Sequence, residues 1–314
     1  MKKAILVILF CSIVLQSREY SSFIHSTNQH ITQLLFYRPY TQTALLKDEN
    51  AVNIDISESN VFQKSEKLNA DFEITTLEVT YWYKYSKKLE LSFNYPIYFL
   101  SKGFLDDGLD TIHHTLGITT TREHDGHTNN QFHFLSGNID KSKSYWVSGN
   151  PQLELKYLLY NQNNLYLSNI LGIKLPLGRK ANGFSSGYVD FMGALALQKN
   201  YDNIIFLTNI ALTYNGKNRV DETIESKRLR YFITVATAFN IYKNVDFLTS
   251  YLYESAPYSG EDVKYNSHSN FLQFGLRVWL KNKDYIDLYF NQNTIPRHNE
   301  ADVTFGLSYF FKGF

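Results

Sequence analysis

The chain has 314 residues, of which 44% are apolar, 16% aromatic and 19% charged, and this composition excludes a chain that is disordered throughout. Lysine and arginine number 31 against 30 acidic residues, a formal net charge of +1, and no basic block points to a nucleic-acid partner. After the first fifteen residues no apolar run approaches the roughly 20 residues that a membrane-spanning helix needs, which excludes a polytopic helical membrane protein.

The N-terminus has the pattern of a secretory signal. Lys2 and Lys3 precede an apolar stretch from Ala4 to Leu15, which is too short to span a membrane as a helix. We therefore predict a signal peptide over residues 1–17 and an N-terminal periplasmic segment over residues 18–50. Cys11 is the only cysteine and lies in the predicted signal, so the mature chain can form no disulfide.

From about residue 50 the sequence alternates between apolar and polar residues with a period of two, which is typical of β-strands. The segment 88–99 shows this most cleanly, because its odd-numbered positions are apolar and its even-numbered positions are mostly polar. The pattern predicts about twelve strands, near 51–57, 71–85, 88–99, 151–161, 164–176, 188–199, 203–214, 227–241, 244–255, 269–281, 284–292 and 302–311.

The predicted connections alternate between tight turns and longer loops. The longer ones are 58–70, 100–150, 177–187, 215–226, 256–268 and 293–301. An up-and-down transmembrane barrel has short periplasmic turns and long outer loops, whereas a soluble sandwich has no reason to segregate loops by length. The prediction is therefore an all-β fold: an antiparallel up-and-down transmembrane β-barrel over residues 51–314, with about twelve strands and one long outer loop.

A soluble periplasmic barrel is the alternative, with its apolar face turned inward. The amount of apolar surface favours the membrane barrel, because twelve strands with about five large side chains each would overfill a soluble core. Aromatic residues also gather near strand ends, as they do at membrane interfaces: Tyr81, Tyr83, Trp279, Tyr309 and Phe311.

Charged residues share the polar face of the predicted strands, and they mix both signs. In a barrel they either line a water-filled path or pair across neighbouring strands and fill a small lumen. Both readings stay open, and a pore of this kind is expected to be narrow and without strong ion preference. The candidate lumen residues are Glu90, Glu154, Lys156, Lys174, Asp190, Arg230, Arg277 and Asp287.

The predicted loop 100–149 is long enough to suggest a function. Apolar residues from Phe104 to Leu116 have helical spacing, so this part could fold over the barrel mouth as a constriction. The loop also holds five histidines, but their spacing matches no metal motif, so we expect no metal and no cofactor. The candidate constriction residues are Gly103, Phe104, Leu105, Asp106, Asp110, His113, His114 and Arg122.

Residues 183–187 match the Gly-x-Ser-x-Gly pattern of a nucleophile elbow. That motif requires a turn from a strand into a helix, whereas here it connects two predicted strands. We interpret it as a flexible turn, and the sequence offers no catalytic residue.

The stretch Gly103-Phe104-Leu105-Asp106, with Asp110, His113-His114, Leu116-Gly117 and Arg122, resembles a block in an uncharacterised family of Gram-negative outer-membrane proteins described as a domain of unknown function. Further similar segments are 149–156, 172–178, Ser186-Gly187, Asp190 and 302–305, so that the resemblance covers about residues 45–314. Asn150 and Ala301 depart from the family pattern, which usually has aspartate and proline there. The resemblance implies a membrane barrel and supplies no activity.

Three functions follow as hypotheses. The first is an outer-membrane barrel of a Gram-negative bacterium that forms a narrow or plugged pore for a small solute. The others are a hydrolase that modifies outer-membrane lipid and a closed structural barrel. The expected partners are outer-membrane lipid, the barrel-assembly machinery and an unidentified small solute, with no nucleic acid.

Overall fold

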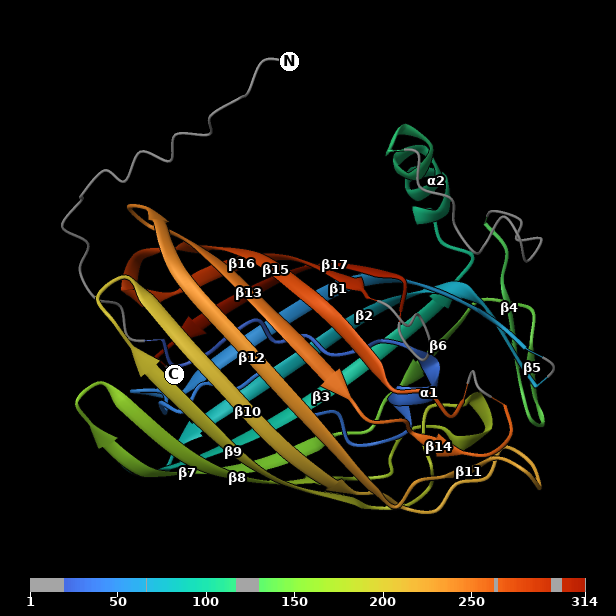
Figure 1. Ribbon diagram of the computed structural model, residues 1–314, viewed down its shortest axis with the longest axis horizontal. Coiled ribbons are helices and arrows are strands. Elements are labelled where there is room, and N and C mark those ends of the chain that lie inside the picture. The colour runs from blue at the N-terminus through green and yellow to red at the C-terminus, as the bar shows by residue number, and fades with distance from the viewer. Residues whose placement is uncertain (1–19, 66, 117–129, 263–264, 295–300, 314) are drawn as a thin grey trace, which may run out of the picture.

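The computed structural model describes residues 20–65, 67–116, 130–262, 265–294 and 301–313 (Figure 1). Twelve antiparallel strands form the barrel, which confirms the predicted fold class and strand number. They are β1 (Ala51–Lys64), β2 (Leu68–Lys84), β3 (Leu89–Ser101), β7 (Gln152–Gln162), β8 (Leu165–Lys174), β9 (Asp190–Asn200), β10 (Ile204–Tyr214), β12 (Leu229–Tyr242), β13 (Val245–Glu254), β15 (Ser269–Trp279), β16 (Tyr285–Asn293) and β17 (Val303–Lys312).

The barrel closes because the first strand pairs with the last. β1 and β17 are antiparallel over ten residue pairs, from Ala51 opposite Lys312 to Asn60 opposite Val303. Every other barrel strand pairs with its neighbours in chain order, including β3 with β7 across the long loop. Closure leaves no edge strand, which is what a sheet needs to reside in lipid.

The alternation of the sequence separates the two faces of the barrel. On β2, Leu77, Val79 and Tyr81 are exposed on the outside, whereas Thr76, Glu78 and Thr80 are buried inside. The outward side chains form the apolar band of a membrane barrel, and the inward ones line a lumen that is largely polar. Trp279 is an exception to the predicted aromatic belt, because it faces the lumen mouth, where its ring contacts Tyr20 and Tyr285.

Tight turns lie at one end of the barrel and longer connections at the other (Figure 1). The predicted long loop 58–70 is wrong, because β1 runs on to Lys64 and β2 begins at Leu68. Apolar residues explain the extension: Val61, Leu68 and Phe72 are buried in an outer apolar cluster instead of lying in solvent.

The loop between β3 and β7 contains α2 (Leu105–Leu116), β4 (His133–Ser136), β5 (Ile139–Lys141) and β6 (Tyr145–Ser148). β4 pairs with the extension of β2 and β6 pairs with the outer end of β3. In Figure 1 α2 projects away from the barrel end. A separate two-stranded sheet, β11 (Glu225–Ser226) with β14 (Tyr258–Ser259), joins two other outer loops.

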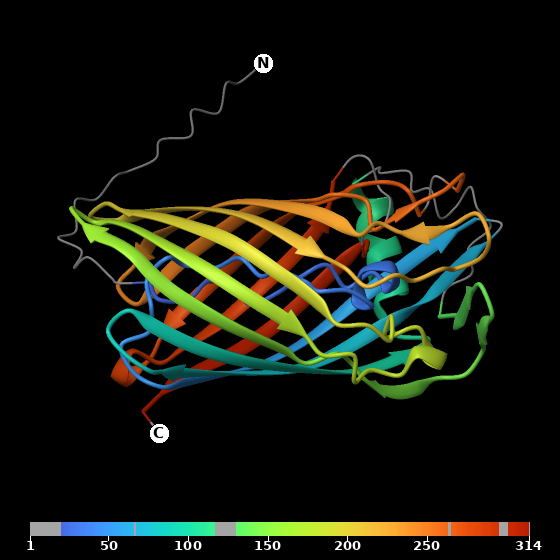
Figure 2. The same cartoon turned by 90° about the horizontal axis from the view of Figure 1, so that it is seen from below.

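The sequence suggested that residues 18–50 form a periplasmic segment. In the structure, residues 20–50 lie inside the barrel (Figures 1 and 2). They run through the lumen towards the outer end, turn at α1 (Ile31–Leu34), and return to the start of β1 (Figures 1 and 2). Most of these residues are buried. We call residues 20–47 the plug, with an outgoing limb over 20–30 and a returning limb over 35–47.

Candidate functional site

The outgoing limb of the plug contacts the lumen wall on several strands, among them β13, β15 and β16. The Tyr20 hydroxyl donates to Asp246, and the Asn28 amide donates to Glu254 at 3.0 Å. The backbone carbonyl of Ser22 accepts from Arg277 at 3.0 Å. Polar wall groups thus bind both ends of this limb.

The turn at the outer end is apolar and seals the lumen there. Ile31, Leu34 and Phe36 are nearly fully buried, and they pack with Phe134 and Tyr258 from the outer loops. The Arg230 guanidinium donates to the side-chain oxygen of Gln33 at 2.6 Å, which ties the turn to β12. These contacts fix the top of the plug between the barrel and its loops.

The returning limb contacts the wall on β2, β7 and β10. The Tyr37 hydroxyl donates to Glu154 at 2.6 Å, and the Tyr40 hydroxyl donates to Glu78 at 2.7 Å. The side chain of Asn209 both accepts from the Gln42 backbone N–H, at 2.7 Å, and donates to its carbonyl, at 2.8 Å. The limb is therefore bound through its backbone as well as its side chains.

The two limbs also contact each other. The His25 and Tyr40 rings stack with centroids 3.7 Å apart, and Arg38 donates to the Thr27 hydroxyl at 2.9 Å. Lys47 donates to the carbonyl of Ser21 at 3.2 Å, where both limbs reach the tight-turn end. The two limbs of the plug therefore form one compact unit.

Three pairs of the predicted lumen residues form ion pairs between neighbouring strands. Arg277 and Asp287 make a bidentate pair at 2.8 Å, Lys174 and Asp190 lie 2.9 Å apart, and Lys156 and Glu90 lie 3.4 Å apart. Each pair joins residues directly opposite in the strand register. All eight predicted lumen residues face the lumen. Glu154 and Arg230, which belong to none of these three pairs, bind the plug.

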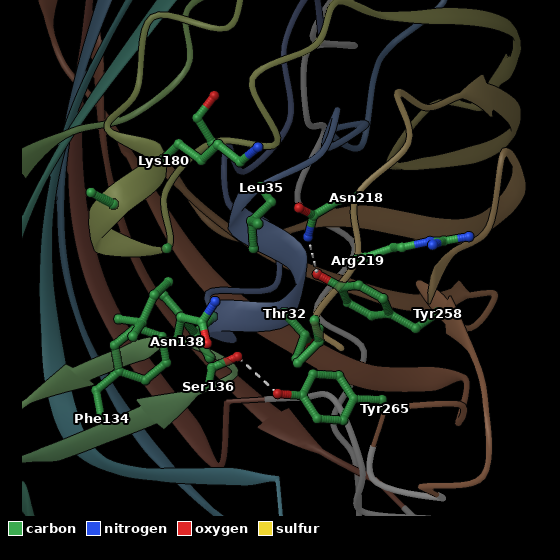
Figure 3. A pocket seen from close by; sticks show the side chains of 16 residues that line it. Thr32, Leu35, Phe134, Ser136, Asn138, Lys180, Asn218, Arg219, Tyr258 and Tyr265 are labelled. Atoms are coloured by element: carbon green, nitrogen blue, oxygen red, sulfur yellow. Dashed lines mark hydrogen bonds between the residues drawn. The ribbon is translucent and has the colours of Figure 1, made fainter. Parts of the chain in front are cut away.

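Above the turn, the outer loops enclose a cavity of about 390 Å³ (Figure 3). Ile31, Thr32 and Leu35 of the plug contribute to its lining, together with outer-loop residues such as Phe134, Tyr258 and Tyr265. We call this cavity the vestibule. Its volume is within the range of small-molecule sites, and the plug lies between it and the lumen.

Ion pairs hold the loops around the vestibule. Lys67, in the β1–β2 connection, lies 2.6 Å from Asp221 in the loop 215–228. The hydrogen bond from Lys67 lowers the pKa of Asp221 to about 2, and this carboxyl stays ionised at neutral pH. Glu225 accepts from both Arg219 and Lys217, and these hydrogen bonds lower its pKa too.

Those predicted constriction residues whose side chains are described lie away from the lumen. Phe104 is 69% exposed, and Glu73 accepts from the backbone N–H groups of Phe104 and Leu105, which anchors the start of α2 on β2. Asp106 accepts from Asn60 of β1 at 2.7 Å. Gly103 precedes this anchor with φ +68°, and Asp110, His113 and His114 are on α2, whereas Arg122 lies outside the described residues.

The other motifs of the sequence have structural partners. In the segment 183–187, Ser186 accepts from Lys174 at 3.1 Å and Ser185 accepts from the backbone N–H of Gly187. The segment follows a short 3₁₀ helix, Lys180–Asn182, and precedes β9, so it is not a strand-to-helix elbow. Within the described ranges, no three metal-binding side chains come together.

Sequence reasoning missed the plug because residues 20–50 have no strand periodicity. One signal was present: no aspartate or glutamate occurs between Tyr20 and Lys47, whereas the predicted lumen face is rich in carboxylates. Such complementarity could have suggested that the segment lies against the lumen wall.

Over the part of the chain with described coordinates, no helix combines the length and apolarity needed to span a membrane.

A family model described as "Protein of unknown function (DUF3187)" matches residues 3–313. Among proteins with curated functions, none matches the sequence. The fold is similar to a COG4313 outer membrane channel from Pseudomonas putida F1, with a TM-score of 0.56, 11% identity, and coverage of 83% of this chain and 94% of that one. It is also similar to the NanC porin, with a TM-score of 0.53, 7% identity, and coverage of 84% and 100%. These similarities are to outer-membrane barrels and show the fold alone.

Proposed function

The chain belongs to the DUF3187 family, and we propose that it is an outer-membrane pore of a Gram-negative bacterium whose lumen is closed by its own N-terminal plug. In this proposal a small solute enters the vestibule from outside, and it passes only when the plug moves. The fold shared with two outer-membrane channel barrels supports the first part of the proposal.

The observation that carries the proposal is the polar contact between the plug and the lumen wall. Phe23 and Leu46 pack against apolar wall residues, and both limbs are also bound by hydrogen bonds such as those of Asn28, Tyr37 and Gln42. Water can replace such contacts at modest cost, because a hydrogen bond exchanged with water contributes only about 0.5–1.5 kcal/mol. A permanently closed structural barrel could instead fill its lumen with wall side chains alone.

The plug ends before the first barrel strand begins, so it can move without breaking the barrel. Its contacts with the wall are made by side chains and by its own backbone, and it belongs to none of the barrel strands. The ladder of β1 with β17 starts only at Ala51. Displacement of residues 20–47 therefore leaves every strand pair of the barrel in place.

Single-channel recording in planar bilayers tests this function on the full chain. We expect brief, rare openings of the intact protein, and an open probability at least about tenfold higher for Arg38→Gln. Arg38 donates to Thr27 and Glu78, and hydrogen bonds to charged groups contribute about 1.5–3 kcal/mol.

The matched control is Arg228→Gln, since Arg228 is an exposed arginine that contacts Tyr214 outside the lumen. It should open as rarely as the unaltered protein. Heat-modifiable migration shows that each variant contains a folded barrel. Folded proteins that pass no current, with or without the Arg38 change, would overturn the pore.

A further inference from the structure

Four carboxylates follow one another around the lumen within a run of six neighbouring strands, from β13 to β2. In the strand register, Asp246 is opposite Arg277, and Arg277 is opposite Asp287. Asp287 is then opposite Ser308 of β17, which is opposite Asp55, and Asp55 is opposite Glu78. We call Asp246, Asp287, Asp55 and Glu78 the acidic row, and Arg277 is the one base within it.

All four carboxylates of the acidic row are buried and face inward. Arg277 pairs with Asp287, while Asp55 accepts from the Tyr289 hydroxyl at 2.8 Å. A tyrosine hydroxyl is neutral, so this hydrogen bond brings no positive counter-charge to Asp55. The row therefore places four carboxyl groups and a single base on the wall itself.

The other half of the wall is closer to balance. Glu90 on β3 is paired with Lys156 on β7, and Asp190 on β9 is paired with Lys174 on β8. The mixed charges that the sequence predicted are thus unevenly distributed, with the acidic excess on the side formed by β13 to β2.

The plug supplies the groups that the acidic row binds in the closed state. The Arg38 guanidinium lies 3.4 Å from Glu78, and the hydroxyls of Tyr40 and Tyr20 donate to Glu78 and Asp246. Because the plug contains no carboxylate between Tyr20 and Lys47, it presents only cations and neutral groups to the wall. The chain's own segment thus occupies the place of a cationic ligand along the row.

We propose that the open pore selects cations over anions, with the acidic row as its filter, and that its solutes are small cations. This inference rests on the proposed pore function. When the plug leaves, Glu78 loses the Arg38 cation, while the Arg277–Asp287 pair remains on the wall. Charged groups that line a pore set its ion preference, and low-dielectric walls strengthen their field.

Reversal potentials of the full-length Arg38→Gln protein test the inference, because this variant is expected to open often enough for measurement. In a tenfold KCl gradient we expect K⁺ to permeate at least about threefold better than Cl⁻, since charges within a Debye length of roughly 8–10 Å act on a permeating ion. Adding Asp55→Asn and Glu78→Gln to the same chain should bring the K⁺/Cl⁻ ratio close to one.

The matched control adds Glu222→Gln, which removes an exposed carboxylate from an outer loop and should leave the ratio unchanged. Open channels that prefer Cl⁻, or that keep their K⁺ preference after both row substitutions, would overturn the filter while the pore itself stands. Absence of current from every folded variant would instead refute the pore, and the filter with it.

Discussion

The full-length variant Gly172→Leu is expected to hold the pore open. Gly172 on β8 lies opposite Glu154 on β7, and the Tyr37 ring of the plug occupies the space above it. A Cβ at residue 172 would overlap that ring, so a leucine would exclude Tyr37 from its place beside Glu154. Overpacking costs about 1–3 kcal/mol, which predicts an open probability about five- to 150-fold higher in single-channel recordings.

Gly193 provides the matched control for this substitution. It lies on the adjacent strand β9, on the outer face, and a Cβ there would meet nothing within 4 Å. Gly193→Leu therefore adds the same side chain without touching the plug, and its open probability should equal that of the unaltered protein. Equal opening of the two leucine variants would show that Tyr37 does not hold the pore closed.

The second large effect is expected on stability, from Arg277→Met. Arg277 is fully buried, pairs with Asp287, and lies over the Tyr285 ring at 3.6 Å. Methionine keeps much of the side-chain volume but leaves the Asp287 carboxylate buried without its cation. Breaking a buried pair on one side costs about 3–5 kcal/mol, and urea unfolding from lipid vesicles should show that loss.

Lys217→Met tests whether this loss is specific to a buried pair. Lys217 also pairs with a carboxylate, that of Glu225, but its side chain is 42% exposed in an outer loop. Exposed pairs contribute little, so no measurable change in the free energy of unfolding is expected. A similarly small effect for Arg277→Met would mean that water reaches the Asp287 carboxylate in the closed barrel.

The barrel itself could be predicted from the sequence because its strands repeat one simple physical pattern. Lipid outside and polar groups inside force alternation on each strand, as Leu91 and Phe93 against Glu90 and Asn94 show on β3. The exception is the β1–β2 hairpin, where Ser59 and Asn60 appear as loop residues although the strand continues. Pairing with β17 and β2, far along the chain, decides that extension.

The plug could not be predicted in the same way because no repeated pattern specifies it. Its residues contact side chains that lie up to 265 positions away, as Ser26 does with Asn291. The ion pairs of the wall were foreseen as one of two possibilities, and the register of β8 with β9 brings Lys174 and Asp190 together. Which of the wall groups would bind the plug depends on the tertiary fold alone.

Cysteine labelling tests the central claim, that residues 20–47 fill the lumen of the barrel in a membrane. Thr43 is about 1% exposed, and Thr43→Cys changes its size little; the natural Cys11 lies in the predicted signal peptide. In proteoliposomes a membrane-impermeant maleimide should label Thr43→Cys slowly, and Ser142→Cys, in an exposed outer loop, rapidly. Adding Gly172→Leu should make the cysteine at 43 react quickly. Rapid labelling of Thr43→Cys alone, in a folded barrel, would contradict a lumen closed by the N-terminal segment.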